Sequence, residues 1–184
     1  MFSPADRCPM KIRRLAAVLS LAFVPSLSSA QDAPVAKAFR DFAADEAKNL
    51  IAAAEQMPAD KYTFKPTPAQ MSFADIQMHL AMGNDLLCGL IGGTKAPARS
   101  AVPASSNKEA LVARLKETFA FCDQALAGLD DSKLTEPLSF FGRTMTRAAI
   151  ETLTVGDWAD HYSQIAIYMR LNGQLPPTAK KPGA

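Results

Sequence analysis

Apolar residues recur at three- and four-residue steps in four segments of the chain, which is the spacing of one buried face on an α-helix. The first segment runs from Pro34 to Met57, is rich in Ala, Lys and Glu, and contains no glycine and no second proline. Pro58 ends it, and Pro66 and Pro68 favour extended chain beyond it. The pattern therefore predicts a first helix over 34–57.

The second and third segments each carry a helix start signal. Ser72 offers a capping hydroxyl for a helix that runs to about residue 91, and residues 106–109 fit a reciprocal capping box with Ser106 as the cap. The buried stripes predicted for these two helices are Phe73, Ile76, Leu80, Gly83, Leu87 and Leu90, and then Leu111, Leu115, Phe119, Cys122, Leu126 and Leu129.

The fourth helix is predicted to begin near Arg147 and to end at Asn172, where Gly173 can supply the left-handed closing residue. Residues 140–142, just before it, fit a short turn or strand. Four helices of roughly 20 residues bury their stripes most naturally in an antiparallel bundle. The predicted fold class is all-α, a four-helix bundle.

Polar side chains occupy the face of the fourth helix that a bundle should bury. The residues on this face are Ile150, Thr154, Asp157, His161, Gln164 and Tyr168. A buried carboxylate and imidazole destabilise the fold by several kcal/mol unless they pair or bind a cation. Asp157 and His161 are one helical turn apart, and His79 lies beside the stripe of the second helix.

We expect both histidines to point inward and to meet Asp157 as a site for zinc, nickel, iron or manganese. Two simpler interpretations also fit the spacing. Asp157 and His161 can form a hydrogen bond within the helix, or a core histidine can bond to Tyr168.

The first thirty residues have the composition of an export signal. Basic residues at 11–14 precede an apolar run over 15–27, which is too short to span a bilayer comfortably, and small residues at 28 and 30 suit cleavage before Gln31. We expect a signal peptide over 1–30 that could start at Met10, a helical bundle over 31–178 and a flexible tail over 179–184. The protein would then be periplasmic or secreted; the alternative is an uncleaved anchor.

Cleavage changes both the charge and the cysteine content. The leader holds four of the 20 basic and one of the 18 acidic residues, so the net charge changes from +2 to −1. A chain without a clustered basic face is not expected to bind nucleic acid.

The cysteines that remain, Cys88 and Cys122, fit either a disulfide or two buried thiols, and as a metal pair they are less suitable than the histidines and Asp157.

Motifs in both halves of the predicted bundle are similar to those of a known family. The opening half carries Ala54-Glu55-Gln56-Met57-Pro58, Tyr62-x-Phe64-x-Pro66 and Met71-Ser72-Phe73-x-x-Ile76-x-x-His79-Leu80-Ala81. The closing half carries Asp157-x-x-x-His161-x-x-Gln164-Ile165 and Tyr168-Met169-Arg170-Leu171-Asn172-Gly173-x-x-Pro176-Pro177. Together, over residues 36–177, these motifs resemble the DinB/YfiT-like family.

The resemblance implies an up-down-down-up topology and a divalent metal held by three histidines, one on the second helix and two, spaced by four, on the last. His79 and His161 fall on the first and third positions, and Asp157 stands where the remaining histidine is expected. A two-histidine, one-carboxylate site would favour harder ions such as manganese or iron somewhat. The same aspartate also fits a lineage that has lost its metal.

The resemblance leaves two classes of function open. Some relatives are metal-dependent thiol S-transferases or hydrolases, and in such an enzyme Gln164 or Tyr168 would orient a small-molecule substrate. Those transferases use cytosolic thiols, so export favours a hydrolase. The alternative is a non-catalytic bundle with a degenerate metal- or ligand-binding site. Dimers are common in related bundles, which makes a homodimer one state to expect, and residues 140–141 are the apolar surface that the loops offer to a partner.

Overall fold

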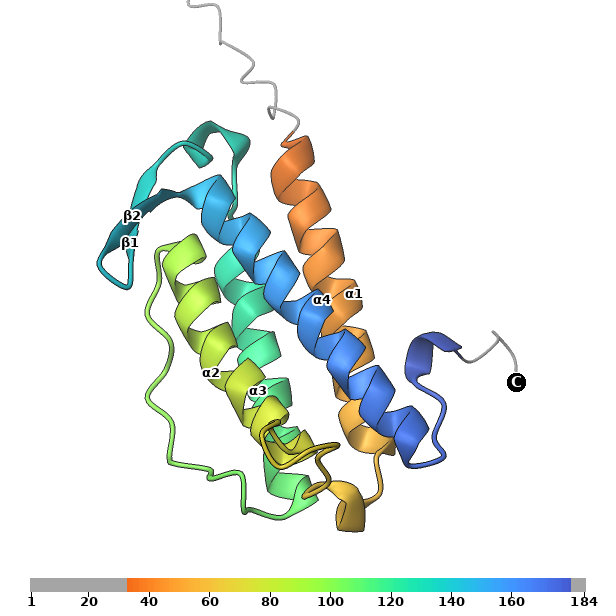
Figure 1. The fold of residues 1–184 in the computed structure, drawn as a ribbon. Coiled ribbons are helices and arrows are strands. Elements are labelled where there is room, and N and C mark those ends of the chain that lie inside the picture. Colours follow the sequence, from red (N-terminus) through yellow and green to blue (C-terminus); the bar gives the residue numbers. More distant parts are fainter. Residues whose placement is uncertain (1–32, 180–184) are drawn as a thin grey trace, which may run out of the picture. The chain divides into compact units, whose positions relative to one another are not determined.

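Capping residues and prolines set the ends of four long helices in the computed structural model, which describes residues 33–179 (Figure 1). The helices are α1 Pro34–Gln56, α2 Phe73–Gly92, α3 Lys108–Leu126 and α4 Arg147–Leu171. The expected signal peptide over 1–30, and residues 180–184 of the expected tail, lie outside the described residues. Within residues 33–179, no helix combines the length and apolar character needed to cross a membrane.

The direction of the helices follows the family topology. The segment between α2 and α3 returns along the length of the bundle, so that these two helices run in the same direction (Figure 1). Two contacts agree with this: Asn84 bonds to Thr118 and, four residues further along each helix, Cys88 bonds to Cys122. The all-α four-helix prediction is confirmed, with the up-down-down-up order that the resemblance implied.

The caps of the middle helices are partly as expected. Ser72 accepts a hydrogen bond from the amide of Asp75, whose carboxylate accepts one in return from the amide of Ser72, so α2 begins with a capping box. The cap of α3, however, is Asn107 and not Ser106: Asn107 Oδ1 accepts from the amide of Ala110 at 2.9 Å. The amide of Ser106 donates to the carbonyl of Pro103 in the preceding turn, which leaves Asn107, an equally good cap, next to the helix.

A short β-hairpin precedes α4. Strands β1 Pro137–Phe140 and β2 Arg143–Thr146 pair antiparallel, with Phe140 opposite Arg143. Phe141 and Gly142 form the two-residue turn with φ of 47° and 74°, the positive values that the favoured hairpin turns require. Thr146 then caps α4, so the hairpin is attached directly to the helix that carries Asp157 and His161.

The core lies where the four stripes meet. Leu50, Leu80, Leu115 and Ile165 are fully buried, one from each helix, and Trp158 of α4 packs between Phe39 of α1 and Phe119 of α3. Cys88 and Cys122 form a disulfide in this core, with their Cα atoms 5.1 Å apart. Of the two arrangements that the sequence allowed for these cysteines, the structure has the cross-link between α2 and α3.

The disulfide gives the first testable prediction. Residues 31–184, which omit the predicted signal peptide, should show no reactive thiol when they are unfolded without reductant, because the two cysteines are paired. Replacing both cysteines by serine should lower the free energy of unfolding by roughly 3–4 kcal/mol, since the cross-link closes a loop of about 34 residues in the unfolded chain. Thiol titration and denaturant unfolding measure the two effects. Two thiols per chain before reduction would contradict the pairing.

Candidate metal centre

The three candidate ligands come from two packed helices. The capping box at Ser72 fixes where α2 starts, and His79 lies about two turns into that helix. Asp157 and His161 lie one turn apart near the middle of α4, which packs against α2. The structure therefore brings together the residues that the sequence predicted, from positions almost 80 residues apart.

The separations of their donor atoms suit a shared ion. One donor atom from each of His79, Asp157 and His161 lies within 4.8 Å of the other two. Asp157 Oδ1 is 3.7 Å from His79 Nε2 and 3.5 Å from His161 Nε2. These distances exceed the usual range for a hydrogen bond. Two atoms that each bind one tetrahedral ion at about 2.1 Å lie about 3.4 Å apart, so the spacing fits a metal better than a direct bond.

The donor set also fits a divalent metal. Two imidazoles and a carboxylate are the ligand types that zinc, iron, nickel and manganese accept in proteins. In one respect the site is incomplete: Nδ1 of His161 is buried and has no hydrogen-bond partner among the described residues, whereas ligating histidines usually donate from their second nitrogen. The orientation of this ring therefore depends on packing and on Asp157.

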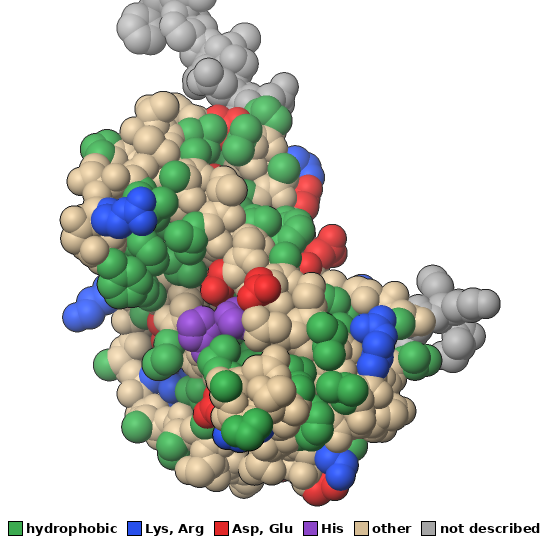
Figure 2. All heavy atoms as spheres, viewed as in Figure 1, with side chains coloured by type: hydrophobic (Ala, Val, Ile, Leu, Met, Phe, Trp, Pro, Cys, Tyr) green, Lys and Arg blue, Asp and Glu red, His purple; other side chains and the backbone are tan. Residues whose placement is uncertain are grey.

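The site is more open than the sequence suggested. The side chain of His161 is only 8% exposed, but that of Asp157 is 25% exposed and that of His79 is 45% exposed. Figure 2 shows the histidine side chains at the surface of the bundle, beside acidic side chains. The expectation that both histidines point into the core is thus wrong for His79, because its face of α2 lies at the edge of the contact with α4.

Charge interactions within the cluster shift two pKa values. Burial alone would raise the pKa of the Asp157 carboxyl, but its interactions with His161 and His79 outweigh burial and lower the pKa from its ordinary value of 3.8. Burial alone would likewise lower the pKa of His161, but Asp157 raises it above 6.5. Asp157 is therefore ionised at neutral pH, the state in which a carboxylate binds metal.

A buried hydrogen-bond chain holds the two helices in register behind the cluster. Trp158 Nε1 donates to Asn84 Oδ1 at 2.8 Å, and Asn84 Nδ2 donates to Thr118 Oγ1 at 3.2 Å. Trp158 follows Asp157 directly in sequence, and Asn84 lies on α2 beyond His79. The chain was not predicted from the sequence, although Asn84, a polar residue next to the apolar stripe of α2, was a signal for it.

An apolar groove of about 310 Å³ leads away from the cluster toward the hairpin. His79 and Asp157 form its polar end, and its walls include Met82 and Leu86 of α2, which are 64% and 46% exposed. Exposed apolar surface was expected only at residues 140–141. Met82 and Leu86 also contribute to the exposed apolar surface, because these residues project on the outer face of α2, which no other described helix covers.

The predicted substrate-orienting residues lie elsewhere. Gln164 Nε2 donates to Asp160 Oδ2 at 2.7 Å, and the hydroxyl of Tyr168 donates to the carbonyl of Met71 at 2.9 Å. Neither residue lines the groove. Tyr168 lies two turns beyond His161, about 10 Å along the helix, toward the opposite end of the bundle from the hairpin. The bond to Met71 also removes the interpretation in which Tyr168 bonds to a core histidine.

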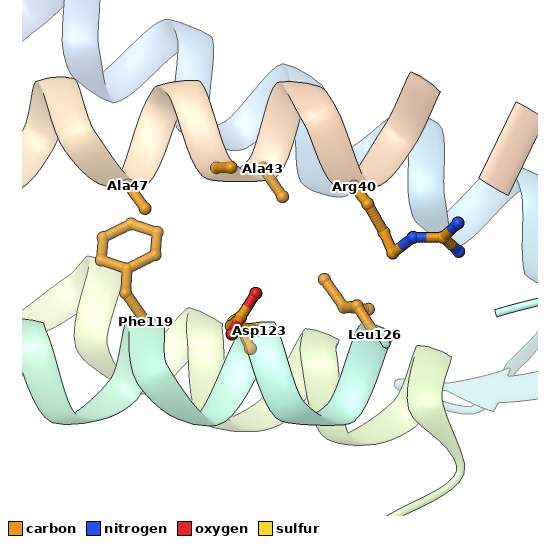
Figure 3. Close-up of a pocket in the computed structure, with 8 residues that line it drawn as sticks. Arg40, Ala43, Ala47, Phe119, Asp123 and Leu126 are labelled. Atoms are coloured by element: carbon orange, nitrogen blue, oxygen red, sulfur yellow. The ribbon is translucent and has the colours of Figure 1, made fainter. Parts of the chain in front are cut away.

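A second cavity, between α1 and α3, is much smaller. Figure 3 shows Ala43 and Ala47 of α1 facing Phe119 and Asp123 of α3 across it. Its volume is about 40 Å³, which leaves room for no more than a few water molecules. This cavity is too small for a ligand larger than a few water molecules. The groove beside His79 is therefore the better candidate site.

A four-helix bundle with two histidines and a carboxylate on facing helices is a typical architecture for a metalloprotein. The family model of the DinB superfamily matches residues 44–165, and the chain belongs to this superfamily. No curated protein matches the chain at a significant level.

Solved structures of DinB-like proteins share the fold. One from Bacillus cereus has a TM-score of 0.64 at 16% identity, covering 77% of this chain and 95% of its own. One from Bacillus subtilis has a TM-score of 0.63 at 20% identity, covering 79% and 99%. A conserved protein from Enterococcus faecalis has a TM-score of 0.61 at 15% identity, covering 74% and 96%. At these identities the likeness concerns the fold alone.

Substitution of Asn84 tests whether its hydrogen bond with Trp158 stabilises the packing of α2 against α4. Asn84→Leu preserves the side-chain volume but leaves the indole N–H buried without an acceptor, which should lower the free energy of unfolding by about 1–3 kcal/mol. The emission maximum of Trp158, the single tryptophan of the chain, should also shift. The matched control is Gln77→Met, because Gln77 is equally buried but its amide has no partner in the described chain. Equal destabilisation by both variants would contradict the account.

The raised pKa of His161 predicts a pH dependence in the metal-free protein. Its imidazolium stabilises the fold most fully below pH 6.5, and this contribution is lost as the pH rises through the raised pKa. The Asp157 carboxylate contributes fully above pH 3.8 and loses its contribution as the pH falls. NMR titration of the ring protons should show His161 titrating above 6.5, and Asp157→Asn should lower that pKa.

The control for this titration is Asp160→Asn, which removes an exposed carboxylate directly adjacent to His161 in sequence and should change the pKa of His161 less. The chain contains two histidines, so a His79→Gln variant assigns the signals. A pKa of His161 that is unchanged in Asp157→Asn would show that the pair does not interact.

Proposed function

We propose that this chain binds one divalent metal ion through His79, Asp157 and His161, and acts outside the cytoplasm as a metal-dependent hydrolase of a small molecule. The observation that carries the proposal is the convergence of three donor atoms within 4.8 Å at the end of a solvent-accessible groove. Export rests on the basic and apolar pattern of residues 1–30.

Three protein ligands beside an open groove suit catalysis better than storage of an ion. Structural sites surround the metal with four protein ligands, whereas catalytic sites keep a position free. A divalent ion would supply Lewis acidity, which polarises a carbonyl or phosphoryl oxygen and lowers the pKa of water. The openness of the cluster at His79 therefore favours the enzyme over the non-catalytic bundle.

The residues of the cluster have distinct positions relative to an entering molecule. His161 is the buried anchor and does not line the groove, whereas His79 and Asp157 do. A molecule that moves along the groove meets these two side chains first. Two neutral imidazoles and one carboxylate leave a bound divalent ion with a net positive charge, which attracts an electron-rich atom of the substrate.

Metal titration of the mature protein tests the proposal. One equivalent of zinc, nickel, manganese or iron should bind, and His79→Ala, His161→Ala and Asp157→Ala should each weaken binding by more than about 100-fold. Loss of an outer-shell partner alone costs 10–100-fold, and loss of a ligand should cost more. Asp157→His, which restores the three-histidine set of the family, should retain binding and shift the preference toward zinc or nickel.

The matched control is Asp160→Asn, since Asp160 is an exposed carboxylate on the same helix that belongs to no ligand group. Water-proton relaxation of the manganese-loaded protein then separates catalysis from storage. An open coordination position predicts strong enhancement from exchanging water, and full coordination by protein predicts little. Failure of all four metals to bind would overturn the proposal.

A further inference from the structure

The groove beside the metal cluster has apolar walls along most of its length. The wall residues are Met82, Leu86, Leu87, Phe140, Phe141 and Leu153. They come from α2, from the hairpin and from α4, so three separate elements meet around one space. Figure 2 shows hydrophobic side chains gathered on the hairpin side of the histidines. A soluble protein rarely groups exposed apolar side chains in this way without a binding role.

The direction of the groove follows from the helix geometry. On α2, His79, Met82 and Leu86 are three and four residues apart, so they lie along one face. On α4, Leu153 lies one turn before Asp157. Because α2 and α4 run in opposite directions (Figure 1), the apolar residues of both helices lie on the hairpin side of the cluster. The groove therefore has a polar end at the metal ligands and an apolar end at the hairpin.

The hairpin turn holds an aromatic ring at the edge of this groove. Phe141 is 80% exposed and has φ of 47°, in the left-handed region that non-glycine residues seldom adopt. Its ring contacts that of Phe140 edge to face, with centroids 4.5 Å apart. A strained backbone position that places a large apolar side chain in solvent is typical of a binding element.

The charges around the groove restrict what it can bind. Of the nine described residues that line it, none is a lysine or arginine, Asp157 is the single acid and His79 is the single histidine. The volume of about 310 Å³ lies at the lower end of the range for small-molecule sites. The chemistry therefore suits a molecule with an uncharged hydrocarbon body and one donor atom for the metal, and disfavours a body that carries negative groups.

We infer that the groove binds the apolar body of an uncharged aryl or medium-length alkyl compound, and that Met82, Leu86 and Phe141 determine this specificity. The compound would place its metal-binding donor atom at His79 and Asp157, and this part of the inference rests on the proposed metal function. Binding of the body does not, because the apolar walls are present without a metal.

Another apolar cavity, of about 320 Å³, lies between α1 and α4 and provides a control. Val35 and Phe42 are among the residues that line it, and no group of metal ligands among residues 33–179 adjoins it. Val35 is 48% exposed and Leu86 is 46% exposed, so serine substitution removes comparable surface from each cavity. The two variants differ mainly in which cavity they alter.

Binding of the neutral fluorescent probe N-phenyl-1-naphthylamine to the metal-free mature protein tests the inference. Leu86→Ser and Phe141→Ser should each weaken binding by about fivefold or more, as removal of about 1 kcal/mol of apolar contact predicts. Val35→Ser should leave binding unchanged, and the sulfonated probe 1-anilinonaphthalene-8-sulfonate should bind more weakly than the neutral one. These side chains are exposed, so the variants should fold, which thermal unfolding checks.

The outcomes separate the two proposals. In the zinc-loaded protein, octanohydroxamate should bind at least tenfold more tightly than acetohydroxamate, and Phe141→Ser should reduce that ratio without changing the affinity for zinc. His161→Ala should abolish zinc binding and leave binding of the neutral probe intact. Probe binding that is insensitive to Leu86→Ser and Phe141→Ser would overturn the inference, as would a dimer that Phe141→Ser dissociates, since a second copy would then cover the groove.

Discussion

The candidate site depends on the hydrogen-bond chain that joins Trp158 to Asn84 and Asn84 to Thr118. These groups are buried, so each would destabilise the fold if it lost its partner, and the bonds fix how far α4 can slide or rotate relative to α2. Asp157 precedes Trp158 in the chain, so the hydrogen bond that anchors the indole also determines where the side chain of Asp157 points. The disulfide one turn beyond Asn84 fixes α2 to α3 in the same region. A partly exposed cluster of ligands thus rests on a buried, hydrogen-bonded layer.

This arrangement explains how the bundle accommodates charged groups near its core. A fully buried carboxylate between two imidazoles would be strongly destabilising in the absence of a cation. Here Asp157 and His79 remain partly exposed, and His161 alone is deeply buried. Partial exposure lowers the desolvation cost and at the same time leaves the cluster open to solvent. The aspartate, at a position where the family resemblance implied a histidine, adds a negative charge that attracts a divalent ion, and His161 retains a raised pKa as long as no metal competes for it.

Sequence reasoning was most successful where local chemistry decides the structure. The four helices and the cap at Ser72 follow from caps and helical periodicity, and the meeting of His79 with Asp157 and His161 follows from their spacing together with the family resemblance. Periodicity assigns a residue to a face but not to a depth, which is why the exposure of His79 was missed. Tertiary contacts also decided what the sequence left open: the cysteines could pair only if α2 and α3 approached closely, and the groove exists because a hairpin folds beside α2.

The central claim is that the three side chains share one ion at the polar end of the groove. Crystals of residues 31–184 grown with manganese or zinc, measured at the absorption edge of the metal, test it most directly. The account predicts one anomalous peak within bonding distance of His79 Nε2, Asp157 Oδ1 and His161 Nε2, with a coordination position open toward Met82 and Leu86. A well-ordered structure without a peak there, or with the metal held by other residues, would contradict it.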